Sequence, residues 1–206
     1  MNNQETPGEK PDILLHICCA PCATHAVDVL KADFRVTGLF YGPNIHPEIE
    51  YIMRLEEAER FAKIAGIQLI RAEYDMTRWF YKVEGLETDS EGGERCSSCC
   101  SMRLEKTAEY AVEKGIKFFT TTLSISPHKD AADINTSGAE IAERYGLTYH
   151  HADFKKNGGF QRSVEISRKL ELYRQDYCGC VFSRRMRDLR IGARKKKLAS
   201  SEDKRR

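Results

Sequence analysis

Apolar runs of strand length alternate with stretches of helical periodicity along most of this chain, and this alternation limits the possible fold more than any other feature. The first apolar run is ILLHI (13–17), and others follow at 34–41 and 67–73. Residues 47–65 carry apolar side chains at helical spacing, and Gly66 follows as a stop signal. Strands and helices that alternate through short connections form parallel sheets covered by helices on both faces.

The second half of the chain continues this pattern. We expect a fourth strand at 114–124, a helix at about 130–145 and a further strand at 146–151. The predicted class is therefore α/β, with a Rossmann-like, open, mostly parallel sheet. Loops that follow parallel strands meet at the carboxyl edge of the sheet. The cysteine-rich loop CCAPC, the loop SISPHK and the loop DFKKNGGF should converge on that edge.

The chain of 206 residues is long enough for one domain with a sizeable core. We predict a polar leader at 1–11, a single α/β domain at 12–190 and a basic, flexible tail at 191–206. Residues 75–100 interrupt the alternation and are interpreted as an insertion that carries a CxxC motif. The leader lacks the pattern of a signal peptide, and no apolar run could cross a bilayer, so a cytoplasmic protein without a membrane partner is expected.

Positive charge is concentrated at the C-terminus. Residues 183–206 contain eleven Lys and Arg against three Asp and Glu, a net charge of +8, although the whole chain carries only +2. Such a basic block indicates an anionic partner, with nucleic acid favoured over membrane, unless it is merely a solvated terminus.

The eight cysteines fall into three groups with short spacings. In a reducing compartment, clustered cysteines are more often metal ligands or redox catalysts than structural disulfides. Structural zinc, a thiol–disulfide centre with a disulfide bond, and an iron–sulfur cluster all stay open, and the last is favoured because it accepts ligands from distant loops. The groups are CCxxC at 18–22, CxxCC at 96–100 and CxC at 178–180.

Five motifs, in this order, resemble the QueH family of epoxyqueuosine reductases: HICCAPC, EGGERCSSC, TTLSISPHK, DFKKNGGF and LYRQDYCGCVFS. The resemblance extends over about residues 12–185. It implies an oxidoreductase that reduces epoxyqueuosine at the tRNA wobble position to queuosine, the last step of queuosine biosynthesis, without cobalamin. It also implies a [4Fe–4S] cluster, an additional mononuclear metal (iron or zinc) nearby, and an aspartate among the cluster ligands.

The resemblance assigns seven cysteines to metal binding and leaves Cys100 as a packing residue. For the carboxylate ligand, Asp153 is the first choice because its loop should reach the same edge of the sheet, and Asp75 is the second. The seven cysteines are Cys18, Cys19, Cys22, Cys96, Cys99, Cys178 and Cys180.

Conversion of an epoxide to an alkene consumes two electrons and two protons and releases water. Iron–sulfur clusters deliver electrons singly, and the chain lacks a GxGxxG fingerprint, so we expect an external electron donor and no bound NAD(P). The candidate catalytic residues are His128, Lys129 and Asp153. His16, on the first strand, is either a proton donor or a hydrogen-bonded core histidine.

A tRNA base must leave its stack to reach a buried centre, and the aromatic residues at 74–81 offer surfaces for stacking. The expected partner is the anticodon stem-loop of a tRNA bearing epoxyqueuosine. The candidate tRNA-binding residues are Lys155, Lys156, Arg174, Arg184, Arg185, Arg194, Lys195, Lys196 and Lys197.

Two other functions are compatible with the motifs. One is a non-catalytic, zinc-stabilised RNA-binding module. The other is an iron–sulfur enzyme similar to those that thiolate tRNA with ATP. The loop CCAPC lacks the glycines and serine that would hold a pyrophosphate, which counts against the second alternative.

Overall fold

A computed structural model describes residues 10–203 of the chain, with side chains described for residues 10–194. Its centre is a five-stranded parallel sheet with the strand order β3-β2-β1-β4-β5. The predicted α/β class with a parallel sheet is confirmed. The strands are β1 (Asp12–Ile17), β2 (Arg35–Phe40), β3 (Gln68–Arg71), β4 (Phe118–Thr121) and β5 (Thr148–Tyr149).

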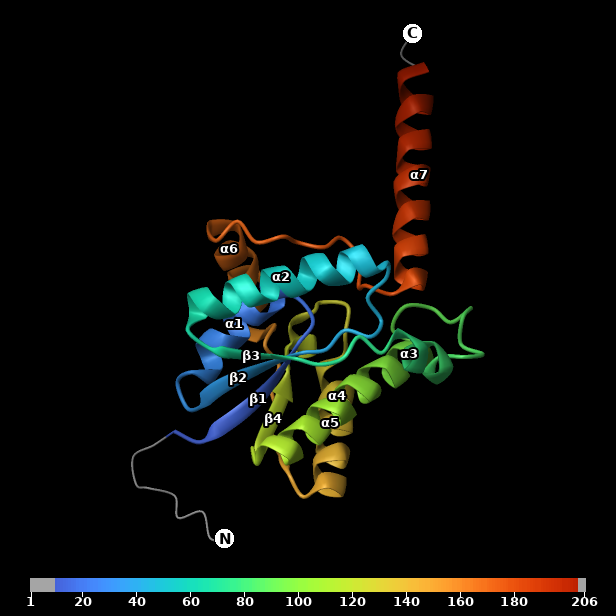
Figure 1. The fold of residues 1–206 in the computed structure, drawn as a ribbon. Coiled ribbons are helices and arrows are strands. Elements are labelled where there is room, and N and C mark those ends of the chain that lie inside the picture. The colour runs from blue at the N-terminus through green and yellow to red at the C-terminus, as the bar shows by residue number, and fades with distance from the viewer. Residues whose placement is uncertain (1–9, 204–206) are drawn as a thin grey trace.

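Helices cover both faces of this sheet (Figure 1). Because side chains alternate along a strand, Leu14 of β1 packs into one cluster while Ile13 and Leu15 pack into another. The first cluster includes residues of α4 (Glu94–Lys114) and α5 (Ala131–Tyr145). The second includes residues of α1 (Ala20–Leu30) and α2 (Glu48–Ala65), and α6 (Gly159–Lys169) packs against α1.

Shorter helices lie in the connections at the carboxyl edge. They are α3 (Met76–Lys82) and the 3₁₀ turns η1 (Thr122–Ile125) and η2 (Lys156–Gly158). None of the helices in the described part of the chain is long and apolar enough to cross a membrane.

Two elements begin or end away from their expected positions. The predicted insertion at 75–100 contains α3, and α4 already begins at Glu94, so the CxxCC motif is helical. The boundary predicted at 190 falls inside α7 (Val181–Asp203), which projects from the body of the molecule (Figure 1). Residues 191–203, expected as a flexible tail, are helical because they contain strong helix formers and no proline. Most of the leader and the side chains of Lys195–Lys197 lie outside the described residues.

Candidate metal centre

The first cysteine group lies between the end of β1 and the start of α1. Cys19 is the N-cap residue of α1; Cys18 and Cys19 are buried, and Cys22 is half-buried. The hydrogen bond with Cys18 lowers the pKa of the Cys19 thiol, whereas the hydrogen bond with Cys22 and burial raise it, to about 12. These contacts place all three thiols side by side at the N-terminus of α1.

The second group occupies the first two turns of α4. Cys99 and Cys100 are buried, and Cys96 is half-buried with its sulfur accepting a hydrogen bond from the Gly92 N–H at 3.3 Å. Burial raises the pKa of Cys99 to about 12, although the nearby Arg103 guanidinium lowers it. The spacing of Cys96, Cys99, Cys100 and Arg103 puts them on neighbouring turns of one helix face.

The third group leads directly into α7. Cys180 is buried, and its sulfur accepts a hydrogen bond from the Ser183 N–H at 3.3 Å, as a helix-capping group does. Cys178 is half-buried and lies beside the second group, because its thiol contributes to the raised pKa of both Cys96 and Cys99.

All three groups therefore lie at helix N-termini, those of α1, α4 and α7. The positive end of a helix dipole stabilises a thiolate, which is the form that binds a metal. For α1, the position of the cysteines follows from the parallel topology, because the loop that leads into α1 begins at the carboxyl end of β1. All eight cysteines are free thiols in the structure.

Two cavities meet at these cysteines. The larger, of about 560 Å³, is lined by Cys18, Cys19, Cys22 and Cys178, and the smaller, of about 330 Å³, by Cys96 and Cys100. Both also include His128 and Lys129 of the SPHK loop in their walls.

A buried cation stands among the thiols. Arg103 is only 1% exposed and lines the larger cavity, and its Nε and Nη2 atoms find no hydrogen-bond partner among the described residues. Burial lowers the pKa of Arg103, but the thiols of Cys99, Cys18, Cys100 and Cys178 raise it by more.

Lys129 shares three of these neighbours, since the thiols of Cys178, Cys100 and Cys99 raise its pKa. A buried positive charge needs a negative partner. The donor set therefore fits an anionic thiolate-bound metal group. In the described residues, no three His, Cys, Asp or Glu side chains already stand in metal-binding geometry.

The remaining predicted catalytic and ligand residues lie at different distances from the cysteines. Asp153 lines a neighbouring hollow that it shares with His128 and Lys129, and its carboxylate lies 3.7 Å from Lys155 Nζ and 4.0 Å from Lys156 Nζ. Asp75 is the N-cap of α3, where it accepts a hydrogen bond from the Arg78 N–H at 3.2 Å; helix capping accounts for its carboxylate.

His16 is a core histidine. It is fully buried, and its ring nitrogens contact Thr121 Oγ1 at 2.8 Å and the Tyr41 carbonyl at 2.9 Å. Burial lowers its pKa to about 3, which keeps the ring neutral. Trp79 is also buried, at 1% exposure, and packs on His46, whereas Phe80 and Tyr81 are exposed.

The predicted tRNA-binding residues form two groups. Arg174 lines the larger cavity and bonds Ser167 Oγ at 2.8 Å, whereas Arg184, Arg185 and Arg194 lie exposed on α7. Lys155 donates to the Lys129 carbonyl at 2.8 Å and Lys156 is exposed, and both line the hollow that contains Asp153.

Several residues of this centre were not predicted from the sequence. Arg103 follows Cys99 and Cys100 at helical spacing, so its place beside them could have been predicted. That prediction requires a helix that begins before Cys96, as α4 does. Arg54, which donates to the Cys178 carbonyl at 3.0 Å, lies 124 positions from Cys178 in the chain, and no sequence pattern connects the two residues. Asp176, Arg187 and Arg190 line the larger cavity as well.

Fold and site together define an α/β protein with a thiol-rich candidate metal centre at the carboxyl edge of a parallel sheet. Residues 13–186 match the family model described as Epoxyqueuosine reductase QueH. The chain belongs to this family, and it is thus an oxidoreductase, as the motifs predicted.

Relatives named Epoxyqueuosine reductase QueH cover most of the chain. The protein from Haemophilus influenzae is 45% identical over 183 residues, 88% of this chain and 75% of that protein. The protein from Streptococcus pyogenes serotype M1 is 40% identical (90% and 75% covered), and that from Thermotoga maritima 38% identical (83% and 89% covered).

Among solved structures, the chain is similar to the U34-tRNA thiolase NcsA from Methanococcus maripaludis with its [4Fe-4S] cluster. The TM-score is 0.42 at 12% identity, over 82% of this chain and 69% of the other. That likeness is too distant to assign a cofactor.

Proposed function

We propose that this chain reduces the epoxide of epoxyqueuosine in tRNA to the alkene of queuosine, with a [4Fe–4S] cluster and without cobalamin. The observation that carries this proposal is the meeting of three cysteine groups, each at a helix N-terminus, around the buried Arg103. When bound, the cluster supplies electrons one at a time, and the reaction needs two together with two protons.

The seven predicted cysteines would hold the cluster and an additional mononuclear iron or zinc. Cys100 joins them in burial and lines the smaller cavity, so its thiol is available to a metal as well as to packing. Asp153 remains a predicted ligand. Two carboxylates, Glu91 and Asp176, line the larger cavity. Asp176, which pairs with Arg187 at 2.5 Å and precedes the third cysteine group, is in our view the better-placed aspartate.

Arg103 and Lys129 would stabilise the negative charge that the surrounding thiols carry once they lose their protons to bind a metal. Their positive charges also favour the uptake of electrons, because each added electron makes the centre more negative. His128 and Lys129 line both cysteine cavities and are the candidate proton donors to the departing epoxide oxygen. His16 takes no part in this, since both of its ring nitrogens are engaged in the core.

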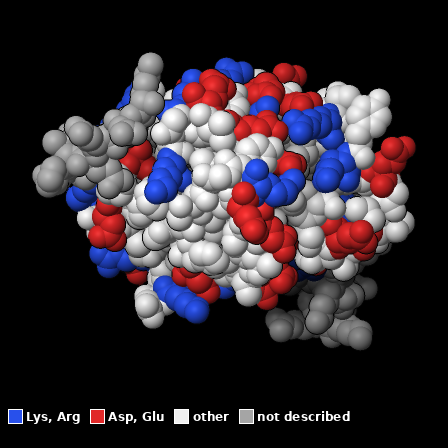
Figure 2. All heavy atoms as spheres, turned by 90° about the horizontal axis from the view of Figure 1, so that it is seen from below, with Lys and Arg blue, Asp and Glu red and all other residues white. Residues whose placement is uncertain are grey.

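The larger cavity has room for an extruded nucleoside, since pockets of 300–1,000 Å³ hold ligands of that size. Arg174, Arg187 and Arg190 line this cavity, and α7, which carries the last two, projects from the body of the molecule (Figure 1). We infer that the anticodon stem lies along the basic start of α7. The opposite face carries intermixed basic and acidic side chains around a neutral area, which does not suit a polyanion (Figure 2).

The electron donor is external, because the chain carries no dinucleotide fingerprint. We place the protein in the cytoplasm, where the eight free thiols stay reduced and tRNA is present.

Purification without oxygen tests the proposal. We expect about four irons and four sulfides per chain, a broad absorption band and conversion of epoxyqueuosine in tRNA when a reductant is supplied. Zinc alone, with no sulfide after attempted reconstitution, would support the zinc-stabilised RNA-binding module instead.

Arg103 provides a sharper test. Arg103→Leu removes the buried charge at similar size and should lose most of the iron and sulfide, whereas Arg103→Lys keeps the charge and should retain more. Equal iron content in both variants and in the unaltered protein would contradict the role given to this charge.

A further inference from the structure

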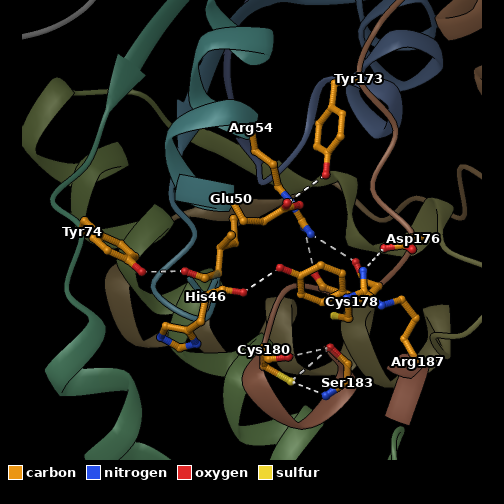
Figure 3. Close-up of polar contacts among 12 residues, drawn as sticks. His46, Glu50, Arg54, Tyr74, Tyr173, Asp176, Cys178, Cys180, Ser183 and Arg187 are labelled. Carbon is orange, nitrogen blue, oxygen red and sulfur yellow. Dashed lines mark hydrogen bonds and ion pairs between the residues drawn. The ribbon is translucent and has the colours of Figure 1, made fainter. Parts of the chain in front are cut away.

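The segment that carries Cys178 and Cys180 is held by side chains from α2 (Figure 3). Arg54 of α2 is only 1% exposed, and its guanidinium donates to the Cys178 carbonyl at 3.0 Å and to the Tyr177 carbonyl at 3.2 Å. Its Nε donates to Glu50 at 2.7 Å, which leaves the guanidinium a single orientation.

Further contacts hold the same turn from the chain segment before α2. The His46 N–H donates to the Gly179 carbonyl at 2.9 Å, and the Tyr177 hydroxyl donates to the His46 carbonyl at 2.6 Å. Gly179 has φ +134°, and a Cβ there would lie 3.3 Å from Arg54 Nη1. The turn therefore needs glycine both for its backbone conformation and for the close approach of Arg54.

Arg54 also faces the first cysteine group. Burial lowers the pKa of Arg54, whereas the thiol of Cys19, the paired Glu50 carboxylate and the thiol of Cys18 raise it, so the guanidinium lies within electrostatic range of those thiols. One side chain thus hydrogen-bonds to the backbone of the third cysteine group and lies near the thiols of the first.

We propose that Arg54 is a positioning residue that fixes the Cys178–Cys180 turn relative to Cys18 and Cys19. Arg54 is not among the residues that line either cysteine cavity, so it acts through the cysteines and does not touch the substrate. The inference rests on the metal centre proposed above, but its first test does not require a metal.

A second arginine on α2 supplies a matched control. Arg60 pairs with Glu57 at 3.1 Å and donates to the carbonyls of Leu170 at 3.0 Å and Glu171 at 2.8 Å. Like Arg54, Arg60 pairs with a glutamate of α2 and donates to two backbone carbonyls. Those carbonyls lie at the beginning of the segment between α6 and α7, away from the Cys178–Cys180 turn.

The first test is the rate at which iodoacetamide alkylates each cysteine of the metal-free protein, followed by peptide mass spectrometry. Arg54→Met should raise the rate at Cys178 about tenfold, because the loss of hydrogen bonds from a charged donor frees the turn. Arg54→Lys should give a smaller rise, since one ammonium cannot span Glu50 and two carbonyls. The rate at Cys96, which is on α4, should not change.

The second test is reconstitution with iron and sulfide under anaerobic conditions. The Arg54 variants should bind less iron and show an altered spectrum, whereas Arg60→Lys should match the unaltered protein in both assays. If Arg54→Met does not fold, Tyr173→Phe removes the hydrogen bond from Tyr173 to Glu50 (2.8 Å) and should raise alkylation at Cys178 to a lesser degree.

Unchanged alkylation at Cys178 in the Arg54 variants would overturn the proposal, and so would an equal rise at Cys96 or an equal effect of Arg60→Lys. If the unaltered protein takes up no iron and sulfide, the proposed metal centre is refuted. The alkylation rates would still show whether Arg54 positions the Cys178–Cys180 turn.

Discussion

His46 makes the stability of this protein depend on pH. Its ring is only 4% exposed, stacks on Phe80 with ring centroids 4.9 Å apart, and packs on Trp79 at 5.1 Å. Neither ring nitrogen has a hydrogen-bond partner among the described residues. Burial in this setting lowers the pKa of His46 from 6.5 to about 4.

The sign and size of the effect follow from linkage. Above pH 6.5 the histidine is neutral in both the folded and the unfolded protein, so its contribution to stability is fully present. As the pH falls from 6.5 toward 4, only the unfolded chain binds the proton, and stability is lost. At pH 5, about 1.5 units below the unfolded value, the loss is up to about 2 kcal/mol.

The assay is urea unfolding of the metal-free protein at pH 7.5 and pH 5, compared with His46→Phe. This variant keeps an aromatic ring beside Phe80 and sacrifices no hydrogen bond of the original side chain. Other buried histidines, such as His16, destabilise both proteins alike at low pH. We expect the variant to lose about 1–2 kcal/mol less than the unaltered protein between the two pH values. Equal losses would refute the reasoning.

Three further predictions follow from the packing and the charge. Gly138→Ala should lower the free energy of unfolding by about 1–3 kcal/mol, because its Cβ would lie 2.4–2.6 Å from ring carbons of the buried Tyr149. Gly192→Ala, with nothing within 4 Å, should instead raise stability by about 0.5–1 kcal/mol through higher helix propensity; thermal melts of both variants check the pair. Replacement of Arg184 and Arg185 by alanine should weaken tRNA binding and reduce its dependence on salt by about one phosphate contact each, measured as affinity against salt concentration. An unchanged salt dependence would exclude these two residues from the interface.

The three helix N-termini explain how a protein can gather so many thiols without disulfides. Cys19 caps α1, Cys96 lies in the first turn of α4, and Cys180 directly precedes α7. The dipole of each helix favours negative charge at its cysteines, the Ser183 N–H of α7 donates to the Cys180 sulfur, and the buried Arg103 adds a full positive charge. The fold therefore supplies positive potential at the place where a thiolate-bound metal would concentrate negative charge.

The convergence of the loops was predictable because it depends on topology alone. Parallel strands that alternate with helices bring the ends of β1 and β4 to one edge, so Cys18 and His128 had to approach each other. The start of α4 was not predictable, because the stretch before Cys96 is rich in glycine and acidic residues and shows no apolar periodicity. The helical state of residues 191–203 was missed for a similar reason, since a solvated basic block has the same composition whether or not it is helical.

The sequence by itself determined the order of the five strands, the family and the identity of the thiol groups, because periodicity and motif spacing are local properties. Only the tertiary structure decided which charged residues serve those thiols. Arg54 reaches the Cys178 carbonyl from 124 positions away, and Arg103 is enclosed by cysteines from all three groups. These contacts form because helices pack together at the edge of the sheet. The sequence alone does not show which residues far apart in the chain come into contact there.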